Sequence, residues 1–384
     1  MISTSFLQTK DKNLSLTMMC NIDLSCFQAS YYDARQCLLS GISAVPDALV
    51  QHHQSYPHPL TGPGDQRLYL DWLQLGQHSA PEHVLVLISG THGVEGFTGS
   101  AIQSHYLGYL VEEMKRNAKL GVIIIHALNP WGFAWLRRYD HEGIDLNRNF
   151  VDFQLSLPGN NEYELLHDDL ICDTSRPVLE TLAYWQEKLG QQDFYAGITR
   201  GQYQYANGLF YGGVNPSWSR QVLEKACQVD ALQQARNIAV IDLHTGLGPY
   251  GHGEVINDHD PASGGFMLAR DWYGANAQSA LLGESCSAPK TGLLDYFWHS
   301  LVGDRGCFVT LEYGTYSLDD LLNRSAEEQR YHNSYGSDLH RRNISFAAVS
   351  QMRDFFYPRE QFWQELVLFR AGQVIRMALQ GFPS

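Results

Sequence analysis

The sequence lacks the cysteine pattern of a disulfide-bonded protein. Its seven cysteines among 384 residues are odd in number, widely scattered and without any C-x-x-C pair. This pattern is typical of reduced thiols inside the cell rather than of a disulfide framework. Residues 1–15 also lack a basic stretch followed by an apolar one, so we expect no secretory signal. Together these absences predict a cytoplasmic protein.

Positive charge and long apolar runs are also scarce. The chain has 27 Lys and Arg against 41 Asp and Glu, a formal net charge of −14. That balance argues against nucleic acids and anionic membranes as partners. No apolar run is long enough to cross a bilayer, so we expect no membrane partner. With 44% hydrophobic residues the chain has the composition of a globular protein with a sizeable core, which leaves its oligomeric state open.

Short, solid apolar runs indicate the central strands of an α/β fold. Residues 84–88 and 122–125 are two such runs, and residues 99–119 between them have the pattern of an amphipathic helix. Further strands are predicted at 238–243 and 307–312. Runs without polar alternation suit strands that are covered on both faces. The sequence therefore predicts a mixed, mostly parallel central sheet flanked by helices.

We expect a single domain over residues 1–384. Met18 and Met19 are alternative starts that would leave 1–18 as an unstructured tail. Residues 51–65 are rich in His, Pro and Gly and are predicted to form a loop. Residues 151–236 separate the motif-bearing pieces and are predicted to be an insertion that shapes a pocket, with helices at 177–189 and 218–235. The tail over 346–379 is predicted to form two helices.

Two histidines and two glutamates stand at the ends of the predicted strands. His92 and Glu95 follow the run at 84–88, and His244 and Glu312 close two other runs. In open α/β sheets ligands gather outside the carboxyl ends of the strands, so these four side chains are expected to meet in one crevice. Two imidazoles and one carboxylate, with a fourth position free, are typical of a catalytic zinc site.

Six short segments, in order, resemble the zinc carboxypeptidases of the carboxypeptidase A type, with the aspartoacylase and succinylglutamate desuccinylase branch as relatives. The segments are H-G-V-E at 92–95, N-P-x-G-F at 129–133, an Arg pair at 137–138, D-L-N-R-N-F at 145–150, H-T-G at 244–246 and L-E-Y-G-T at 311–315. The resemblance extends over residues 65–320. The pattern is closest to an uncharacterised bacterial-type branch, which implies no particular substrate.

The resemblance implies a role for each matching residue of the metal site. His92, Glu95 and His244 would bind zinc. Glu312 would be the general base that activates water and then hands the proton to the leaving amine. Asp145 falls where the family has a carboxylate hydrogen-bonded to the first zinc histidine, which orients that ligand.

The resemblance also implies roles for the basic residues near the zinc. Guanidinium groups there either clamp a substrate carboxylate or polarise a carbonyl. Arg138 would stabilise the oxyanion, with Arg137 as the alternative because the local alignment can slip by one. Asn147 and Arg148 would hold the substrate carboxylate.

The chain departs from the family at the mobile active-site tyrosine, which has no clear counterpart. The nearest alignment puts Ser287 there, and Tyr250, Tyr273 and Tyr296 are equal substitutes. The same alignment would place Leu294 in the pocket wall, which would favour apolar groups.

Two other patterns carry less weight. The remaining histidines are expected to be structural or exposed, with His126 and His252 as reserve ligand candidates. Residues 246–251 match G-x-G-x-x-G after a strand, but Pro249 interrupts the match and no helix is predicted to follow. A dinucleotide site needs that helix N-terminus for the pyrophosphate, so none is expected.

The sequence therefore predicts a zinc-dependent amide hydrolase that acts on a small, carboxylate-bearing peptide. An alternative with the same chemistry is a deacylase of N-acyl amino acids. A third possibility, from another class, is a metal-binding descendant without catalytic activity; the complete set of predicted ligands argues against it.

Overall fold

The computed structural model describes residues 22–275, 277–335 and 342–383. Eight strands form one sheet in the order β1-β2-β4-β3-β5-β8-β6-β7. Their bounds are β1 Val50–Thr61, β2 Arg67–Gly76, β3 His83–Ser89, β4 Leu120–His126, β5 Asn237–Gly246, β6 Gly253–Ile256, β7 Ala277–Gln278 and β8 Gly306–Gly314. The predicted tail over 1–18 lies outside the described residues.

The centre of the sheet is parallel and its flanks are mixed. The pairs β3·β4, β3·β5, β5·β8 and β6·β7 are parallel, whereas β1·β2, β2·β4 and β6·β8 are antiparallel. The four apolar runs found in the sequence are the central strands β4, β3, β5 and β8. The predicted α/β fold with a mixed, mostly parallel sheet is thus confirmed.

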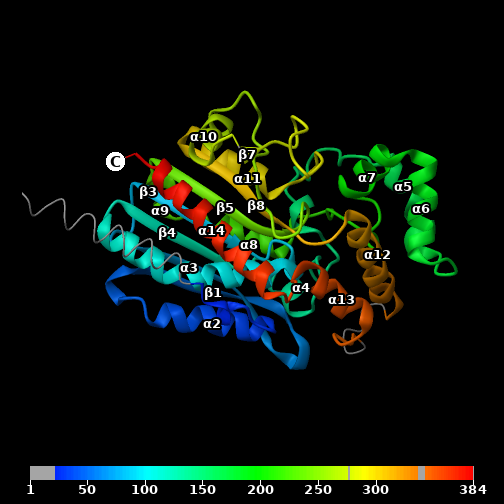
Figure 1. Ribbon diagram of the computed structural model, residues 1–384, viewed down its shortest axis with the longest axis horizontal. Helices are drawn as coiled ribbons and strands as arrows, with labels where there is room; N and C mark the ends of the chain where they lie inside the picture. The colour runs from blue at the N-terminus through cyan, green and yellow to red at the C-terminus, as the bar shows by residue number, and fades with distance from the viewer. Residues whose placement is uncertain (1–21, 276, 336–341, 384) are drawn as a thin grey trace, which may run out of the picture.

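Helices cover both faces of this sheet. They are α2 Tyr31–Ser43, α3 Gly96–Arg116, α4 Pro130–Ala134, α5 Asn161–His167, α6 Val178–Leu189, α7 Gln191–Thr199, α8 Trp218–Ala226, α9 Asp230–Gln234, α10 Gly264–Tyr273, α11 Leu294–Val302, α12 Leu318–Ser334, α13 Ala347–Phe356 and α14 Gln361–Gly381. Figure 1 shows α3 and α14 crossing one face of the sheet, and α5, α6, α7 and α12 grouped beside it.

Alternate residues of the central strands feed two separate cores. In β3, Leu85 and Leu87 pack with α2, α3, α10 and α14, whereas Val84, Val86 and Ile88 pack with α8, α9 and α11 on the other face. Successive side chains of a strand point to opposite faces, so a strand covered on both faces must be apolar throughout. This is why these strands appear in the sequence as solid runs.

The predicted insertion over 151–236 divides into two parts. Helices α5, α6 and α7 pack with α12 around an apolar cluster of their own. Helices α8 and α9 instead cover the sheet. The predicted helix at 177–189 is α6, whereas the one predicted at 218–235 is broken into α8 and α9.

The loop predicted at 51–65 is wrong, because residues 50–61 form the edge strand β1. Most of its side chains are exposed or half-buried, so no apolar pattern marks it. Its prolines are tolerated since an edge strand has one row of N–H groups facing away from the sheet. The two helices of the tail, α13 and α14, are as predicted. None of the helices in the described ranges is long and apolar enough to cross a membrane.

Candidate metal centre

The fold brings the four predicted chemical side chains to one edge of the sheet. His244 at the end of β5 lies directly opposite Glu312 at the end of β8 in the parallel register. His92 follows the end of β3, and Glu95 closes the short 3-10 turn η4, Gly93–Glu95, that leads into α3. All four residues are buried and line one cavity of about 400 Å³.

The turn that carries His92 rests on the segment with the N-P-x-G-F motif. Asn129 caps α4 by accepting a hydrogen bond from the Gly132 N–H at 2.8 Å. The Gly93 N–H donates to the Arg138 carbonyl at 3.1 Å. A Cβ on Gly93 would lie 2.2 Å from the carbonyl carbon of Gly132, so only glycine allows the two backbones to approach this closely. The motif therefore fixes where the first histidine stands.

Four electron-rich atoms converge between His92, Glu95 and His244. The Nδ1 atoms of the two imidazoles are 3.1 Å apart. The Glu95 carboxylate reaches both rings, with Oε1 at 2.8 Å from His92 Nδ1 and Oε2 at 3.0 Å from His244 Nδ1. One ligand atom from each residue lies within 4.8 Å of the others.

Carboxylates hold the outer sides of both rings. Asp242 Oδ2 lies 2.6 Å from His244 Nε2, and Asp145 Oδ1 lies 3.2 Å from His92 Nε2. Asp242 in turn accepts hydrogen bonds from the Thr91 hydroxyl at 2.9 and 3.0 Å. When Nε2–H donates to Asp242, the Nδ1 lone pair of His244 faces the Glu95 carboxylate. Two acceptors this close need a metal ion or a shared proton between them, and the donor set fits a bound metal.

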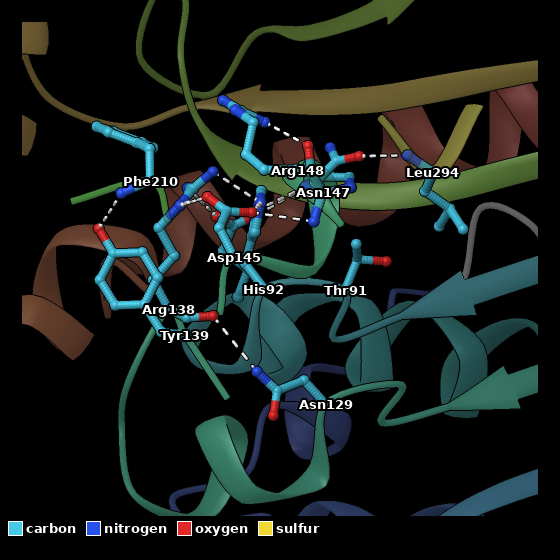
Figure 2. Close-up of polar contacts among 12 residues, drawn as sticks. Thr91, His92, Asn129, Arg138, Tyr139, Asp145, Asn147, Arg148, Phe210 and Leu294 are labelled. Carbon is cyan, nitrogen blue, oxygen red and sulfur yellow. Dashed lines mark hydrogen bonds and ion pairs between the residues drawn. The ribbon is translucent and has the colours of Figure 1, made fainter. Parts of the chain in front are cut away.

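The predicted carboxylate partner of His92 is therefore in place. The carboxylate partner of His244 was not predicted from the sequence. Asp145 was expected from the resemblance and lies beside His92 (Figure 2). Asp242 was hidden inside the apolar run of β5. It stands two residues before His244, and residues two apart in a strand share a face, which is the signal that could have revealed it.

Arg138 lies in the cavity and Arg137 does not. Arg138 Nε is 2.9 Å from Asp145 Oδ2, and its Nη2 is 2.7 Å from His92 Nε2 (Figure 2). Its Nη1 is 3.2 Å from Glu95 Oε1. Arg137 points the other way, to Glu328 Oε1 at 3.2 Å. Of the two alternatives, the structure thus brings only Arg138 to the metal centre.

Asn147 and Arg148 stand on the 3-10 turn η5, Leu146–Arg148, and both line the cavity. The Asn147 Oδ1 accepts the Leu294 N–H at 2.8 Å (Figure 2). Arg148 is buried, and its Nη1 and Nη2 donate to backbone carbonyls, including that of Thr199 at 2.8 Å. Within the described residues Arg148 has no carboxylate within 4.0 Å.

Glu312 is set apart from the metal-binding trio. Its Oε1 accepts the Leu247 N–H at 3.0 Å, and its side chain lines the cavity. Burial raises the pKa of the Glu312 carboxyl to about 7, and the negative charge of Glu95 adds to the rise. A buried carboxyl that titrates near neutrality can both take up and release a proton under ordinary conditions.

The cavity wall differs from the sequence-based expectation in two places. Leu294 is buried in the core under the site, and its neighbour Leu293 lines the cavity instead. Sequence reasoning also missed three charged residues of the wall, Asp258, Lys290 and Asp295. They lie on loops or at a helix start, where no apolar pattern marks their position.

None of the three substitute tyrosines lines the cavity. Tyr250 bonds Glu360 at the surface, Tyr273 is buried in the core, and the Tyr296 hydroxyl donates to the Lys290 carbonyl at 3.0 Å. Ser287 does line it and accepts a hydrogen bond from Lys290. The tyrosine of the wall is Tyr195, from α7 of the insertion, which sequence reasoning did not consider.

The reserve candidates lie elsewhere. His126 is buried between Ser100 Oγ at 2.9 Å and Asp71 at 3.8 Å, and His252 is exposed. Neither lines the cavity. Residues 246–251 join β5 to β6, so a strand and not a helix follows them, as predicted.

Solved structures match the chain over most of its length. Bovine thrombin-activatable fibrinolysis inhibitor, in complex with tick carboxypeptidase inhibitor, is 11% identical with a TM-score of 0.43, covering 92% of this chain and 98% of that chain. Carboxypeptidase A from Helicoverpa armigera is 11% identical with a TM-score of 0.45, covering 91% and 80%. An aspartoacylase family protein from Mesorhizobium loti is 15% identical with a TM-score of 0.36, covering 73% and 65%.

No curated protein matches the chain by sequence. The model of a family described as proteins of unknown function, DUF2817, matches residues 27–370, which include every predicted site residue. The chain therefore belongs to the DUF2817 family.

Proposed function

We propose that the protein is a zinc-dependent hydrolase of amide bonds, similar to a metallocarboxypeptidase, acting on small carboxylate-bearing peptides. One observation carries the proposal. The Nδ1 atoms of His92 and His244 and the carboxylate of Glu95 converge within hydrogen-bonding distance of one another. Beside them, in the same cavity, Glu312 offers a carboxylate that takes no part in that set.

The ligand set fits zinc better than a hard cation. Two imidazole nitrogens and one carboxylate are typical of catalytic zinc, whereas calcium and magnesium prefer oxygen ligands only. When bound, zinc would lower the pKa of a water molecule and polarise the carbonyl of the scissile bond. His92, Glu95 and His244 would hold the ion, and Asp145 and Asp242 would orient the two rings.

Glu312 is suited to move the proton. Its ionised carboxylate would take a proton from the attacking water and pass it to the leaving nitrogen. Its position supports this role, because the side chain reaches the cavity from β8, directly across from His244. A pKa of about 7 allows the group to act as a base and then as an acid near neutral pH.

Arg138 is suited to stabilise the negative oxygen that forms on the carbonyl. A guanidinium has five N–H groups, and the ion pairs of Arg138 with Asp145 and Glu95 use its Nε and Nη1. N–H groups therefore remain for a ligand in the cavity. The same contacts hold the guanidinium in place before substrate arrives, which is how such donors work best.

Arg148 and Asn147 are suited to bind the substrate carboxylate. Arg148 is a buried cation without an ion-pair partner within the described residues, and such a charge favours an anionic ligand. The Asn147 Oδ1 is committed to the Leu294 N–H, which leaves the amide NH2 as the free donor. Two adjacent donors of this kind match the two oxygens of a carboxylate.

A second candidate with the same chemistry is the deacylation of an N-acyl amino acid, which the cavity accommodates as well as it does a small peptide. About 400 Å³ is at the lower end of the range of ligand pockets, so the site suits a compact substrate. Zinc-loaded protein should be assayed against a peptide mixture and against a panel of N-acyl amino acids. Release of C-terminal residues supports the peptidase, and action on acylated amino acids alone supports the deacylase.

The central experiment compares the parent with Glu312→Gln. We expect the variant to bind one zinc at this centre as the parent does but to lose activity by about 10²- to 10⁴-fold. The matched control is Glu254→Gln. Glu254 is also a buried carboxylate, and it lies opposite Glu312 in the antiparallel register of β6 and β8, but it does not line the cavity. Full activity in Glu312→Gln would exclude Glu312 as the base, and no activity in either parent or control would favour a non-catalytic metal-binding protein.

A further inference from the structure

A second group of metal-binding side chains lies in the insertion, away from the cavity. His167 ends α5, and Asp168 and Cys172 bound the π-helical turn η6, Asp168–Cys172. One ligand atom from each residue lies within 4.8 Å of the others. Within the described residues this group and the trio in the cavity are the two clusters with such spacing. Figure 1 shows α5 in the helical group beside the sheet.

The π-helical turn is what brings the ligands together. In an α-helix, residues three and four apart are neighbours, and a π turn inserts one additional residue. His167 and Cys172 are five apart, and their Nε2 and Sγ atoms are 3.8 Å from each other. The wider turn is less stable than an α-helix and often marks a functional site.

Surrounding residues hold this turn in place. The Tyr205 ring stacks on the His167 ring with centroids 3.9 Å apart and an angle of 19°. From α12, Arg330 donates to the carbonyls of Leu170 at 2.8 Å and Asp169 at 3.1 Å. The imidazole is buried, and its Nδ1 has no hydrogen-bond partner. A ligand set held by its neighbours before binding loses less entropy when the ion arrives.

The chemistry of the three side chains selects the kind of ion. A thiolate and an imidazole with one carboxylate suit zinc and similar borderline-soft divalent cations, whereas calcium and magnesium prefer oxygen ligands alone. The exposed Asp168 and Cys172 leave the site open to ions from solution.

We propose that His167, Asp168 and Cys172 form a second site, for a single zinc or similar borderline-soft divalent cation, distinct from the cavity. From the facing loop, the Asn207 Nδ2 donates a hydrogen bond to the Cys172 sulfur at 4.0 Å. That loop leads to Phe210, whose ring lies 5.2 Å from the Arg138 guanidinium. An ion at this site would therefore stabilise one wall of the cavity.

The test uses the full chain, freed of metal with a chelator and titrated with Co²⁺. The His-Glu-His trio has no sulfur ligand, so a sulfur-to-cobalt charge-transfer band reports only on a cysteine site. We expect the band in the parent, its loss in Cys172→Ser and in His167→Gln, and its retention in Cys286→Ser. Cys286 is the control because it is the other exposed cysteine of the described residues and lines the cavity, so retention of the band in its variant excludes a sulfur ligand at the metal centre.

The reactivity of the Cys172 thiol gives a second readout that does not depend on the cobalt absorption band. Saturating Zn²⁺ should slow the alkylation of Cys172 by about tenfold, because the bound thiolate is no longer a free nucleophile. Absence of the band from the parent, or its persistence in Cys172→Ser, would overturn the proposal. If the cavity trio fails to bind metal, the band remains at one Co²⁺ per chain, so failure of the proposed enzymatic function is distinguishable from failure of this site.

Discussion

Asp242 controls, from outside the ligand set, which nitrogen of His244 faces the other ligands. It accepts from His244 Nε2 at 2.6 Å and is itself held by the Thr91 hydroxyl. Replacing it by Asn removes the charge that favours the required tautomer, so we expect zinc affinity to fall by about 10- to 100-fold with the fold intact. Competition with a coloured chelator measures the change. Asp140→Asn, a buried aspartate bonded only to nearby backbone N–H groups, should bind zinc as the parent does.

The ionisation of Glu312 predicts a pH dependence. Only the ionised carboxylate can accept a proton, and the raised pKa of about 7 means that this form is lost as the pH falls through neutrality. A cation bound nearby favours the ionised form, so the acidic limb of kcat/KM should have an apparent pKa no higher than about 7. A profile of the zinc-loaded protein between pH 4 and 9 would measure it. A flat profile would assign the base to another group.

Arg148 should act on binding rather than on the chemical step. Arg148→Met removes the cation that we propose for the substrate carboxylate, so KM should rise by about 10- to 100-fold for a substrate with a free carboxylate. The same substrate with its carboxylate amidated should bind parent and variant almost equally. Kinetics of both substrates on both proteins measure this. Arg148→Lys is the folding control, because it keeps a buried positive charge near the carbonyls that Arg148 contacts.

At the scale of elements, the close contact of the turn η4 with the segment before Arg138 decides whether the metal centre forms. A Cβ on Gly93 would lie 2.2 Å from the Gly132 carbonyl carbon, and backbone on both sides cannot move away cheaply. We expect Gly93→Ala to displace His92, abolish zinc binding and lower the melting temperature. Gly108→Ala is the matched control. It lies in α3 with nothing within 4 Å of the new Cβ, so it should stabilise the protein by about 0.5–1 kcal/mol.

Elements buried on both faces could be predicted from the sequence, and elements at edges could not. The central strands appear as solid apolar runs because alternate residues feed two cores. Strand β1 has exposed residues and two prolines, so nothing distinguishes it from a loop. Helix α8 and helix α9 share one apolar pattern, and the break between them leaves that pattern unchanged.

The residues of the candidate site could be predicted where they stand at the ends of buried strands, and not where they lie inside a strand or on a loop. His244 and Glu312 could be predicted because each closes an apolar strand, and those strands are recognisable in the sequence. Asp242 was overlooked inside its strand, and Lys290 and Asp295 follow no periodic pattern. The choice between Arg137 and Arg138 needed coordinates, because adjacent residues in an irregular segment can point to opposite sides.

At the scale of the whole molecule, the metal centre joins parts of the chain that are far apart in sequence. His92 and Glu95 follow β3, and His244 ends β5, so one ion would link segments about 150 residues apart, as the contact of His92 with His244 shows. A ligand that binds only the folded state stabilises it, by about 2.7 kcal/mol at a concentration 100 times its Kd. Zinc should therefore raise the melting temperature by a few degrees.

To assign this stabilisation to the metal centre in the cavity, the proposed second zinc site must first be removed. In a Cys172→Ser background, the centre in the cavity is the one of the two proposed zinc sites that remains, and calorimetry with and without zinc measures its effect. Glu312→Gln in that background should show the same rise in melting temperature, since Glu312 takes no part in the ligand set. His244→Ala should show none, because two ligands cannot hold the ion against a chelator. An equal rise of the melting temperature in His244→Ala would mean that the stabilising zinc binds elsewhere in the chain. The link between β3 and β5 would then not explain the stabilisation.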